Sequence, residues 1–268
     1  MSSPASSDVE RINTQCCIVG GGPAGMMLGF LLARAGVDAT VLEKHRDFLR
    51  DFRGDTIHPS TMQLMHELGL LDEFLKRPHN EVRELEGQIG DTRVTIADFT
   101  HLPTKSKFIA FMPQWDFLDF VAEHAKRFPT FHLMMETEGV DIIEDAGIVV
   151  GVRAKSHERA LEIGADLVVA TDGRHSTMRA RAGFQSENIG APMDVLWIRI
   201  SRRTSDPGQT FGHTRGGRFL IALDRGDYWQ LAFIIRKGSF EEIQQRGIEA
   251  FHRDLAMLAP YLSDRLGE

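Results

Sequence analysis

A glycine-rich turn between an apolar strand and an apolar helix constrains this chain more than any other feature. Residues Cys16 to Val19 are typical of a buried strand, and Gly20, Gly22 and Gly25 follow with the spacing G-x-G-x-x-G. At this spacing the first glycine makes a tight turn, the second lets the backbone approach a pyrophosphate, and the third lets the helix pack closely on the strand. Backbone N–H groups at the helix N-terminus would face the negative charge. The pattern therefore predicts a dinucleotide-binding β-α-β unit.

The residues after this turn complete the predicted unit. A helix is expected from Ala24 to Ala35, with Gly36 as its cap, and a second strand from Asp38 to Glu43. Glu43 lies eighteen positions beyond Gly25, close to the offset of roughly 20 residues at which an acidic side chain binds the adenosine ribose. A carboxylate there favours an unphosphorylated ribose. The motif by itself does not distinguish NAD from FAD.

A second segment adds specificity. An apolar strand that ends at Ala170 leads into an Asp-Gly pair, Asp172 and Gly173, and Ser176 and Arg179 follow where a loop enters a helix. An Asp-Gly pair alone is an ordinary turn signal. In combination with the glycine motif it is far more specific, and it argues against the alternative of a dehydrogenase that uses NAD alone.

With these residues the chain resembles the class A flavoprotein monooxygenases, typified by para-hydroxybenzoate hydroxylase and the ubiquinone-pathway hydroxylases. The glycine motif with Glu43, the segment around Arg53, and the segment from Asp172 to Arg179 carry the resemblance. It implies that Asp172 and Gly173 lie near the pyrophosphate of FAD and assist NAD(P)H. It also implies that Arg53 contacts the FAD phosphates and that Gln114 hydrogen-bonds the cofactor. The predicted cofactor-binding residues are Gly20, Gly22, Pro23, Ala24, Gly25, Glu43, Lys44, Arg53, Gln114, Asp172, Gly173 and Arg179.

Two of these assignments have ordinary alternatives. Arg53 lies among other charged residues, so its segment could be a solvated surface loop. Gln114 precedes a predicted helix, and its side chain could hydrogen-bond its own backbone.

The resemblance implies an α/β fold with two domains. The first is an FAD-type Rossmann domain, whose first β-α-β unit is followed by a β-meander crossover, and the second is an antiparallel-sheet substrate domain. Short predicted strands between Phe131 and Ala170 fit the meander, and alternating strands from Val195 to Arg236 fit the sheet. A single helix is predicted from Phe240 to Leu258. The predicted domains are a disordered leader (1–12), an FAD-binding domain (13–78 and 108–190), and a substrate domain (79–107 and 191–268).

A third motif of the family, Gly-Asp followed by Ala-Ala-His, is not found in this sequence. Gly-Asp pairs begin at Gly54, Gly90 and Gly226, and none of them precedes Ala-Ala-His. We therefore expect a C-terminally incomplete substrate domain and a chain that covers about the first two thirds of the family's length. Because the absent segment encloses the flavin in that family, the resemblance does not predict that this chain alone is active.

The function implied by the resemblance is an FAD-dependent monooxygenase that uses NAD(P)H and O2 to hydroxylate a small, aromatic substrate. The flavin does the chemistry in such enzymes, so no catalytic acid or base is assigned. The candidate substrate-contacting residues lie on strands of the predicted substrate domain, where packing in the core or on the surface is the ordinary alternative. They are Trp197, Arg199, Tyr228 and Gln230. Two other functions remain open: a non-catalytic FAD- or nucleotide-binding remnant, and an FAD halogenase or reductase on the same scaffold.

The composition limits the kinds of partner and the cellular compartment that the sequence predicts. The net charge is -7, without a basic run, which argues against nucleic acid as a partner. The histidines lack metal-ligand spacing such as H-E-x-x-H, so no metal is predicted. Cys16 and Cys17 are neighbours on one strand and should point to opposite faces, which fits two reduced thiols in the cytoplasm. No apolar stretch approaches the roughly 20 residues that span a bilayer. The oligomeric state stays open.

Overall fold

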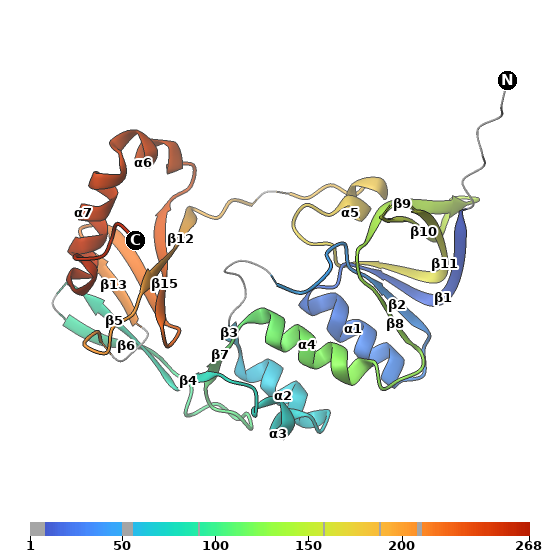
Figure 1. Cartoon of the computed structure of the whole chain (residues 1–268), viewed down its shortest axis with the longest axis horizontal. Coiled ribbons are helices and arrows are strands. Elements are labelled where there is room, and N and C mark those ends of the chain that lie inside the picture. The colour runs from blue at the N-terminus through green and yellow to red at the C-terminus, as the bar shows by residue number, and fades with distance from the viewer. Residues whose placement is uncertain (1–8, 50–55, 91, 158, 188, 208–210) are drawn as a thin grey trace. The chain divides into compact units, whose positions relative to one another are not determined.

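The computed structural model of the chain describes residues 9–49, 56–90, 92–157, 159–187, 189–207 and 211–268 (Figure 1). They form two compact units. Unit 1 contains Met1–Arg50 and Gln114–Glu187, and unit 2 contains Asp51–Pro113 and Asn188–Glu268. The predicted domain limits stay a prediction.

Unit 1 is built on a six-stranded sheet. Its strands, in spatial order, are β8 (Phe131–Met134), β2 (Ala39–Leu42), β1 (Glu10–Val19), β11 (Arg159–Ala170), β10 (Ile148–Ser156) and β9 (Thr137–Asp145). Strands β8, β2, β1 and β11 run parallel, and β11 also begins an antiparallel meander with β10 and β9. The predicted Rossmann arrangement with a meander crossover is confirmed.

Three helices belong to unit 1: α1 (Pro23–Arg34), α4 (Gln114–Ala125) and α5 (Thr177–Arg181). Helix α1 packs against α4 and lies close to the sheet at Gly29. A Cβ atom at Gly29 would lie 2.6 Å from Val41 Cγ2 and 2.9 Å from Phe131 Cε2, so only glycine fits this approach without displacement. Cys16 and Cys17 are buried free thiols, as the sequence predicted.

Two strands of unit 1 differ from the prediction. Strand β1 begins at Glu10, and residues 10–12 pair with Leu161 to Ile163 in β11, so these three residues belong to the sheet rather than to a disordered leader. Residues 1–8 lie outside the described residues. The end of the stretch from Phe131 to Ala170, where the sequence predicts only short strands, is one long strand, because Ala165 stays in register opposite Thr14 and continues the parallel ladder.

Unit 2 contains a second six-stranded sheet. Its strands, in spatial order, are β12 (Met193–Ser201), β15 (Tyr228–Arg236), β14 (Arg218–Asp224), β13 (Phe211–Arg215), β5 (Glu84–Ile89) and β6 (Thr92–Asp98). All neighbours are antiparallel except β13 and β5. A small sheet, β3 (Thr56–Ile57), β7 (Ile109–Phe111) and β4 (Asn80–Val82), and helices α2 (Pro59–Glu67) and α3 (Leu71–Phe74) complete the first segment of this unit.

The C-terminal helices cover one face of this larger sheet. Helix α7 (Ile248–Leu258) and the 3-10 turn η1 (Pro260–Leu262) pack on Ile200, Trp229 and Leu231 in a continuous apolar core. Alternation along the strands places Trp197, Arg199, Tyr228 and Gln230 on the opposite face. We call this second surface the aromatic face.

The helix predicted from Phe240 to Leu258 is two helices. Helix α6 (Phe240–Arg246) ends where Gly247 takes a φ of +81°, and α7 begins at the next residue. A left-handed glycine ends a helix readily, because it has no Cβ atom to clash with the preceding turn.

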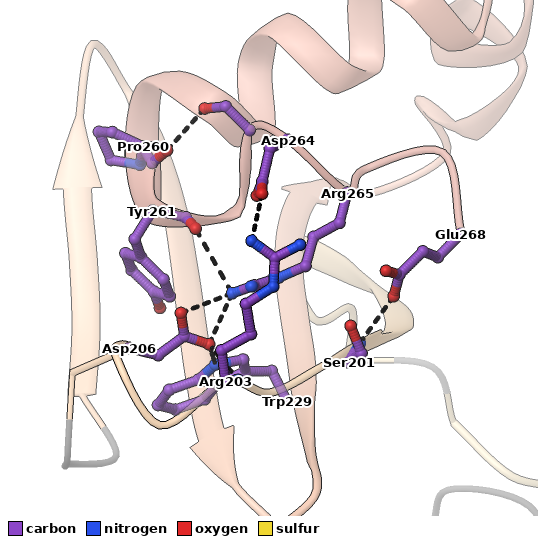
Figure 2. A network of polar contacts seen from close by, with 10 residues as sticks. Ser201, Arg203, Asp206, Trp229, Pro260, Tyr261, Asp264, Arg265 and Glu268 are labelled. Atoms are coloured by element: carbon purple, nitrogen blue, oxygen red, sulfur yellow. Dashed lines mark hydrogen bonds and ion pairs between the residues drawn. The ribbon is translucent and has the colours of Figure 1, made fainter.

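A buried ion pair joins the segment after η1 to the loop after β12 (Figure 2). Arg265 Nη2 donates to both carboxylate oxygens of Asp206 at 2.6 Å, and the two side chains are only 2% and 3% exposed. Trp229 Nε1 and the backbone N–H of Arg203 also donate to Asp206, at 2.8 and 2.9 Å. At the surface, the Arg203 side chain contacts Asp264.

Within the described ranges, no helix has both the length and the apolar character needed to cross a membrane.

Candidate nucleotide-binding site

The glycine turn after β1 is shaped by contacts with the end of β11. Gly20 has a φ of +112°, and a Cβ atom there would lie 2.4 Å from the carbonyl oxygen of Thr171. A Cβ atom at Gly25 would lie 2.0 Å from the carbonyl oxygen of Gly20. Thr171 Oγ1 donates to the carbonyls of Val19 and Gly20 at 3.0 and 2.8 Å, which ties the two strand ends together. Glycine is therefore required at positions 20 and 25 by the protein's own packing.

Gly22 differs from these two glycines. A Cβ atom at Gly22 would meet no protein atom within 4 Å. Gly22 is the N-cap of α1 without a side-chain cap, and Pro23 and Ala24 after it are exposed. The first N–H groups of a helix have no partner within the helix, and the helix dipole makes that end positive. The space beside Gly22 is thus suited to an anionic group such as a pyrophosphate.

Glu43 follows β2 and is buried against the same turn, with 7% of its surface exposed. Its Oε2 atom accepts a hydrogen bond from the backbone N–H of Gly21 at 3.1 Å. Its Oε1 atom accepts one from the backbone N–H of His45 at 2.9 Å and lies 2.5 Å from His45 Nδ1. Glu43 therefore holds the glycine turn, a role that the sequence motif did not reveal, and its predicted contact with a ribose stays a prediction.

The Asp-Gly turn after β11 is held by a short network. Asp172 Oδ1 accepts from Ser176 Oγ at 2.5 Å, and Oδ2 accepts from the backbone N–H of Met178 at 3.1 Å. Ser176 in turn caps α5 by accepting from the backbone N–H of Arg179 at 2.9 Å. Gly173 has a φ of +87°, a conformation that favours glycine. The Arg179 guanidinium donates to the carbonyl of Arg174, which closes the loop.

The two turns lie side by side at the carboxyl ends of the parallel strands. A Cβ atom at Gly20 would lie 2.8 Å from the backbone nitrogen of Asp172, so the two loops are in contact. Strands β2 and β11 flank β1 on its two sides, so the strand order reverses at β1, where the two turns lie. Open α/β sheets bind ligands at such points.

A cavity of about 520 Å³ lies beside the Asp-Gly turn. Asp172 and Arg179 line it, but most of its wall is apolar. An apolar wall does not stabilise a pyrophosphate, so the helix N-terminus at Gly22 remains the better phosphate site. The apolar lining consists of Ile142, Val149, Leu167, Val168, Ala170, Met178, Ala182 and Phe184.

The remaining predicted cofactor residues are less tightly placed. Lys44 is exposed after Glu43, and Gln114 is the half-buried first residue of α4. Arg53 lies outside the described residues. Thr171, which bridges the two turns, was not predicted, because a threonine at the end of a strand carries no distinctive sequence signal.

The fold and the paired turns define a dinucleotide-binding protein of the flavin type. Comparison with known families agrees: the chain belongs to the FAD binding domain family, which matches residues 13–262. The predicted family, the α/β fold and FAD as the cofactor are confirmed at this level. The site geometry fits the cofactor, since the uncapped helix end and the open space at Gly22 suit a pyrophosphate and Glu43 suits a ribose.

Individual relatives are similar over nearly the whole chain. 6-Methylpretetramide 4-monooxygenase from Streptomyces rimosus is 27% identical over 97% of this chain and 62% of its own length. The 3-(3-hydroxy-phenyl)propionate/3-hydroxycinnamic acid hydroxylase from Burkholderia cenocepacia is 26% identical over 95% of this chain and 46% of its own length. The chain thus spans less than two thirds of either relative.

A solved structure shows the same fold. p-Nitrophenol 4-monooxygenase from Pseudomonas putida superimposes with a TM-score of 0.74 at 23% identity, over 91% of this chain and 63% of that one.

Proposed function

We propose that this chain binds FAD and forms part of an FAD-dependent monooxygenase that hydroxylates a small aromatic molecule with NAD(P)H and O2. The observation that carries the proposal is the pair of contacting turns at Gly20 and Asp172, next to the uncapped N-terminus of α1. The relatives named above support the reaction class, because one is named a monooxygenase and the other a hydroxylase.

Each predicted residue has a role in this proposal. Backbone N–H groups after Gly22 bind the pyrophosphate, and Glu43 accepts hydrogen bonds from the ribose hydroxyls. Asp172 fixes the α5 loop so that Gly173 and Arg179 line the cofactor. The other proposed contacts are Gly20, Pro23, Ala24, Gly25, Lys44, Arg53 and Gln114. Bound FAD would supply the redox chemistry, and the chain supplies position and electrostatics.

The proposed partners and compartment rest on simpler observations. The substrates are small molecules, namely an aromatic compound, O2 and NAD(P)H. We place the protein in the cytoplasm, because Cys16 and Cys17 are buried free thiols in neighbouring positions.

Gly22→Ala separates cofactor binding from folding. The added methyl group meets no protein atom within 4 Å, so the free energy of unfolding should change by less than about 1 kcal/mol. The same methyl group occupies the space that the pyrophosphate needs, so FAD affinity should fall at least tenfold in a titration followed by flavin fluorescence. Gly267→Ala is the matched control, since a Cβ atom there also meets nothing within 4 Å. Unchanged FAD affinity in Gly22→Ala would contradict the proposed phosphate site.

The reaction class requires a separate measurement. Oxidation of NAD(P)H that is stimulated by an aromatic compound, with consumption of O2, would support a monooxygenase. A flavin-bound protein without such oxidation would instead support the alternative of FAD binding without catalysis.

A further inference from the structure

The Glu43 carboxylate accepts hydrogen bonds from at least three groups of the protein itself. Its Oε1 atom accepts from the backbone N–H of His45 at 2.9 Å and lies 2.5 Å from His45 Nδ1. Because an ionised carboxylate can only accept, the second contact requires a proton on Nδ1. Its Oε2 atom accepts from the backbone N–H of Gly21 at 3.1 Å. A carboxylate has about four acceptor positions, two on each oxygen, so at most one position, on Oε2, is left for a ligand.

The backbone around Glu43 is held by the turn between β8 and β9. The Glu43 N–H donates to the carbonyl of Met134, and the Glu43 carbonyl accepts from the N–H of Thr137, both at 2.9 Å. The His45 carbonyl accepts from the N–H of Glu136 at 3.0 Å. The contacts that the Glu43 carboxylate makes with backbone N–H groups are therefore fixed by the fold.

The His45 ring is the adjustable partner of Glu43. The His45 side chain is 47% exposed, whereas the Glu43 side chain is only 9% exposed. A histidine side chain turns about two bonds between a few preferred positions, so the contact of its ring with Oε1 can be made or lost without a change in the backbone. In this structure the ring occupies the acceptor position on Oε1 that a second ligand hydroxyl would need.

We propose that His45 restricts Glu43 to a single hydroxyl of the adenosine ribose. The ribose has neighbouring 2′ and 3′ hydroxyls, and each of them needs its own acceptor position. With the His45 ring on Oε1, Oε2 accepts from one hydroxyl, and the other hydroxyl has no acceptor on Glu43. A site that accepts a hydrogen bond from a ligand hydroxyl discriminates against an analogue without that hydroxyl. This inference rests on the proposed function, and it narrows the contact of Glu43 from both ribose hydroxyls to one.

Calorimetric titration of the whole chain with ADP, 2′-deoxy-ADP and 3′-deoxy-ADP tests this inference, because the three nucleotides differ only in the ribose hydroxyls. For the unaltered chain, we expect one deoxy analogue to bind at least about fivefold more weakly than ADP and the other to bind within about twofold of ADP. His45→Phe keeps a flat ring but removes the donor at Nδ1, so Oε1 gains an open acceptor position. In this variant both deoxy analogues should bind at least about fivefold more weakly than ADP, and ADP itself should bind more tightly than it does to the unaltered chain.

Two further variants complete the test. His45→Asn places an amide N–H near the position of Nδ1, so it should restore the preference for one hydroxyl. His132→Phe is the matched control, because the His132 side chain is 52% exposed and its Nε2 atom lies 3.0 Å from Asp38 Oδ1. This control removes a similar contact between a histidine and a carboxylate in unit 1, and it should leave the three nucleotide affinities unchanged. Circular dichroism spectra of all variants verify that the fold is retained.

Two results would overturn the inference. The first is an unaltered chain that does not distinguish the two deoxy analogues, including a chain that binds none of the three nucleotides. The second is a preference for one hydroxyl that survives in His45→Phe. An FAD titration on the same samples separates these outcomes from the proposed function, because FAD binding without the expected preference refutes only the role of His45. The expected nucleotide affinities in a chain that does not bind FAD refute the proposed flavin function and leave an adenosine nucleotide site.

Discussion

Arg265→Met removes the cation of the buried ion pair in unit 2 while it keeps most of the side-chain volume. The Asp206 carboxylate, with its side chain 3% exposed, would keep only the donors from Trp229 and the backbone of Arg203 (Figure 2). A buried carboxylate without its counter-ion is strongly unfavourable. We therefore expect the variant to be much less stable than the unaltered chain.

The magnitude follows from the burial and the short contacts. Two unit charges about 4 Å apart attract by about 4 kcal/mol at an effective dielectric constant of 20. Breaking a buried pair by removing one partner costs about 3–5 kcal/mol in general. Since single domains are stable by about 5–15 kcal/mol, we expect a loss of about 3–5 kcal/mol in the free energy of unfolding, a large share of the total.

The pH dependence gives this prediction a specific sign. Burial alone raises the pKa of the Asp206 carboxyl, but hydrogen bonds from Arg265, the backbone N–H of Arg203 and Trp229 outweigh burial and hold the pKa below its usual value. A lowered pKa in the folded state adds stability above the unfolded pKa of about 3.9, and this stability is lost as the pH falls through the folded pKa. The difference in the free energy of unfolding between the unaltered chain and Arg265→Met should thus be largest near neutral pH and should become smaller below about pH 4.

Urea unfolding at several pH values, followed by circular dichroism and tryptophan fluorescence, measures this difference. Arg203→Met is the matched control, because the Arg203 and Asp264 side chains are 53% and 55% exposed and such surface pairs contribute little. If Arg265→Met lowers the free energy of unfolding no more than Arg203→Met does, the reasoning is refuted. The reasoning is also refuted if the difference in the free energy of unfolding between the unaltered chain and Arg265→Met stays constant from pH 7 to pH 3.

Two further predictions concern unit 1. Asp172→Ala removes the acceptor of the Met178 N–H and of Ser176 Oγ. We therefore expect the free energy of unfolding to fall by about 1–2 kcal/mol and hydrogen exchange at the Met178 amide to become faster. Unchanged exchange would show that Asp172 does not hold the α5 loop. Burial, with a smaller contribution from Cys16, raises the pKa of the Cys17 thiol to about 12, so Cys17 should not react with a disulfide reagent at pH 8 until the protein is denatured. Rapid titration of two thiols in the native protein would contradict this prediction.

Local sequence patterns predicted the part of the site that depends on neighbouring residues. The turn at Gly20 to Gly25, the helix after it and the acid at Glu43 all lie within one β-α-β unit, where strand period, helix period and glycine spacing can be read directly. The meander and the alternating strands of unit 2 could be predicted for the same reason. The structure added that Glu43 also accepts from the Gly21 N–H, a contact that depends on how β2 ends beside the turn.

Long-range pairing decided what the sequence did not reveal. Residues 10–12 are mostly polar and carry no strand pattern, but a parallel partner about 150 residues away in β11 supplies their hydrogen bonds. Arg265 and Asp206 are 59 residues apart, and nothing in either segment marks them as partners. The break at Gly247 was also missed, since an apolar period on both sides of a glycine resembles one continuous helix.

The amino-acid sequence alone therefore determined the class of ligand, because a backbone that must approach a pyrophosphate requires glycines at fixed spacing and a helix start directly after a strand. It also supplied Trp197, Arg199, Tyr228 and Gln230 as candidates, without showing that they meet. Only the tertiary structure decided that these four residues share one face, since that depends on the register of β12 against β15. A shift of one residue in that register would place Gln230 opposite a core position instead of Arg199.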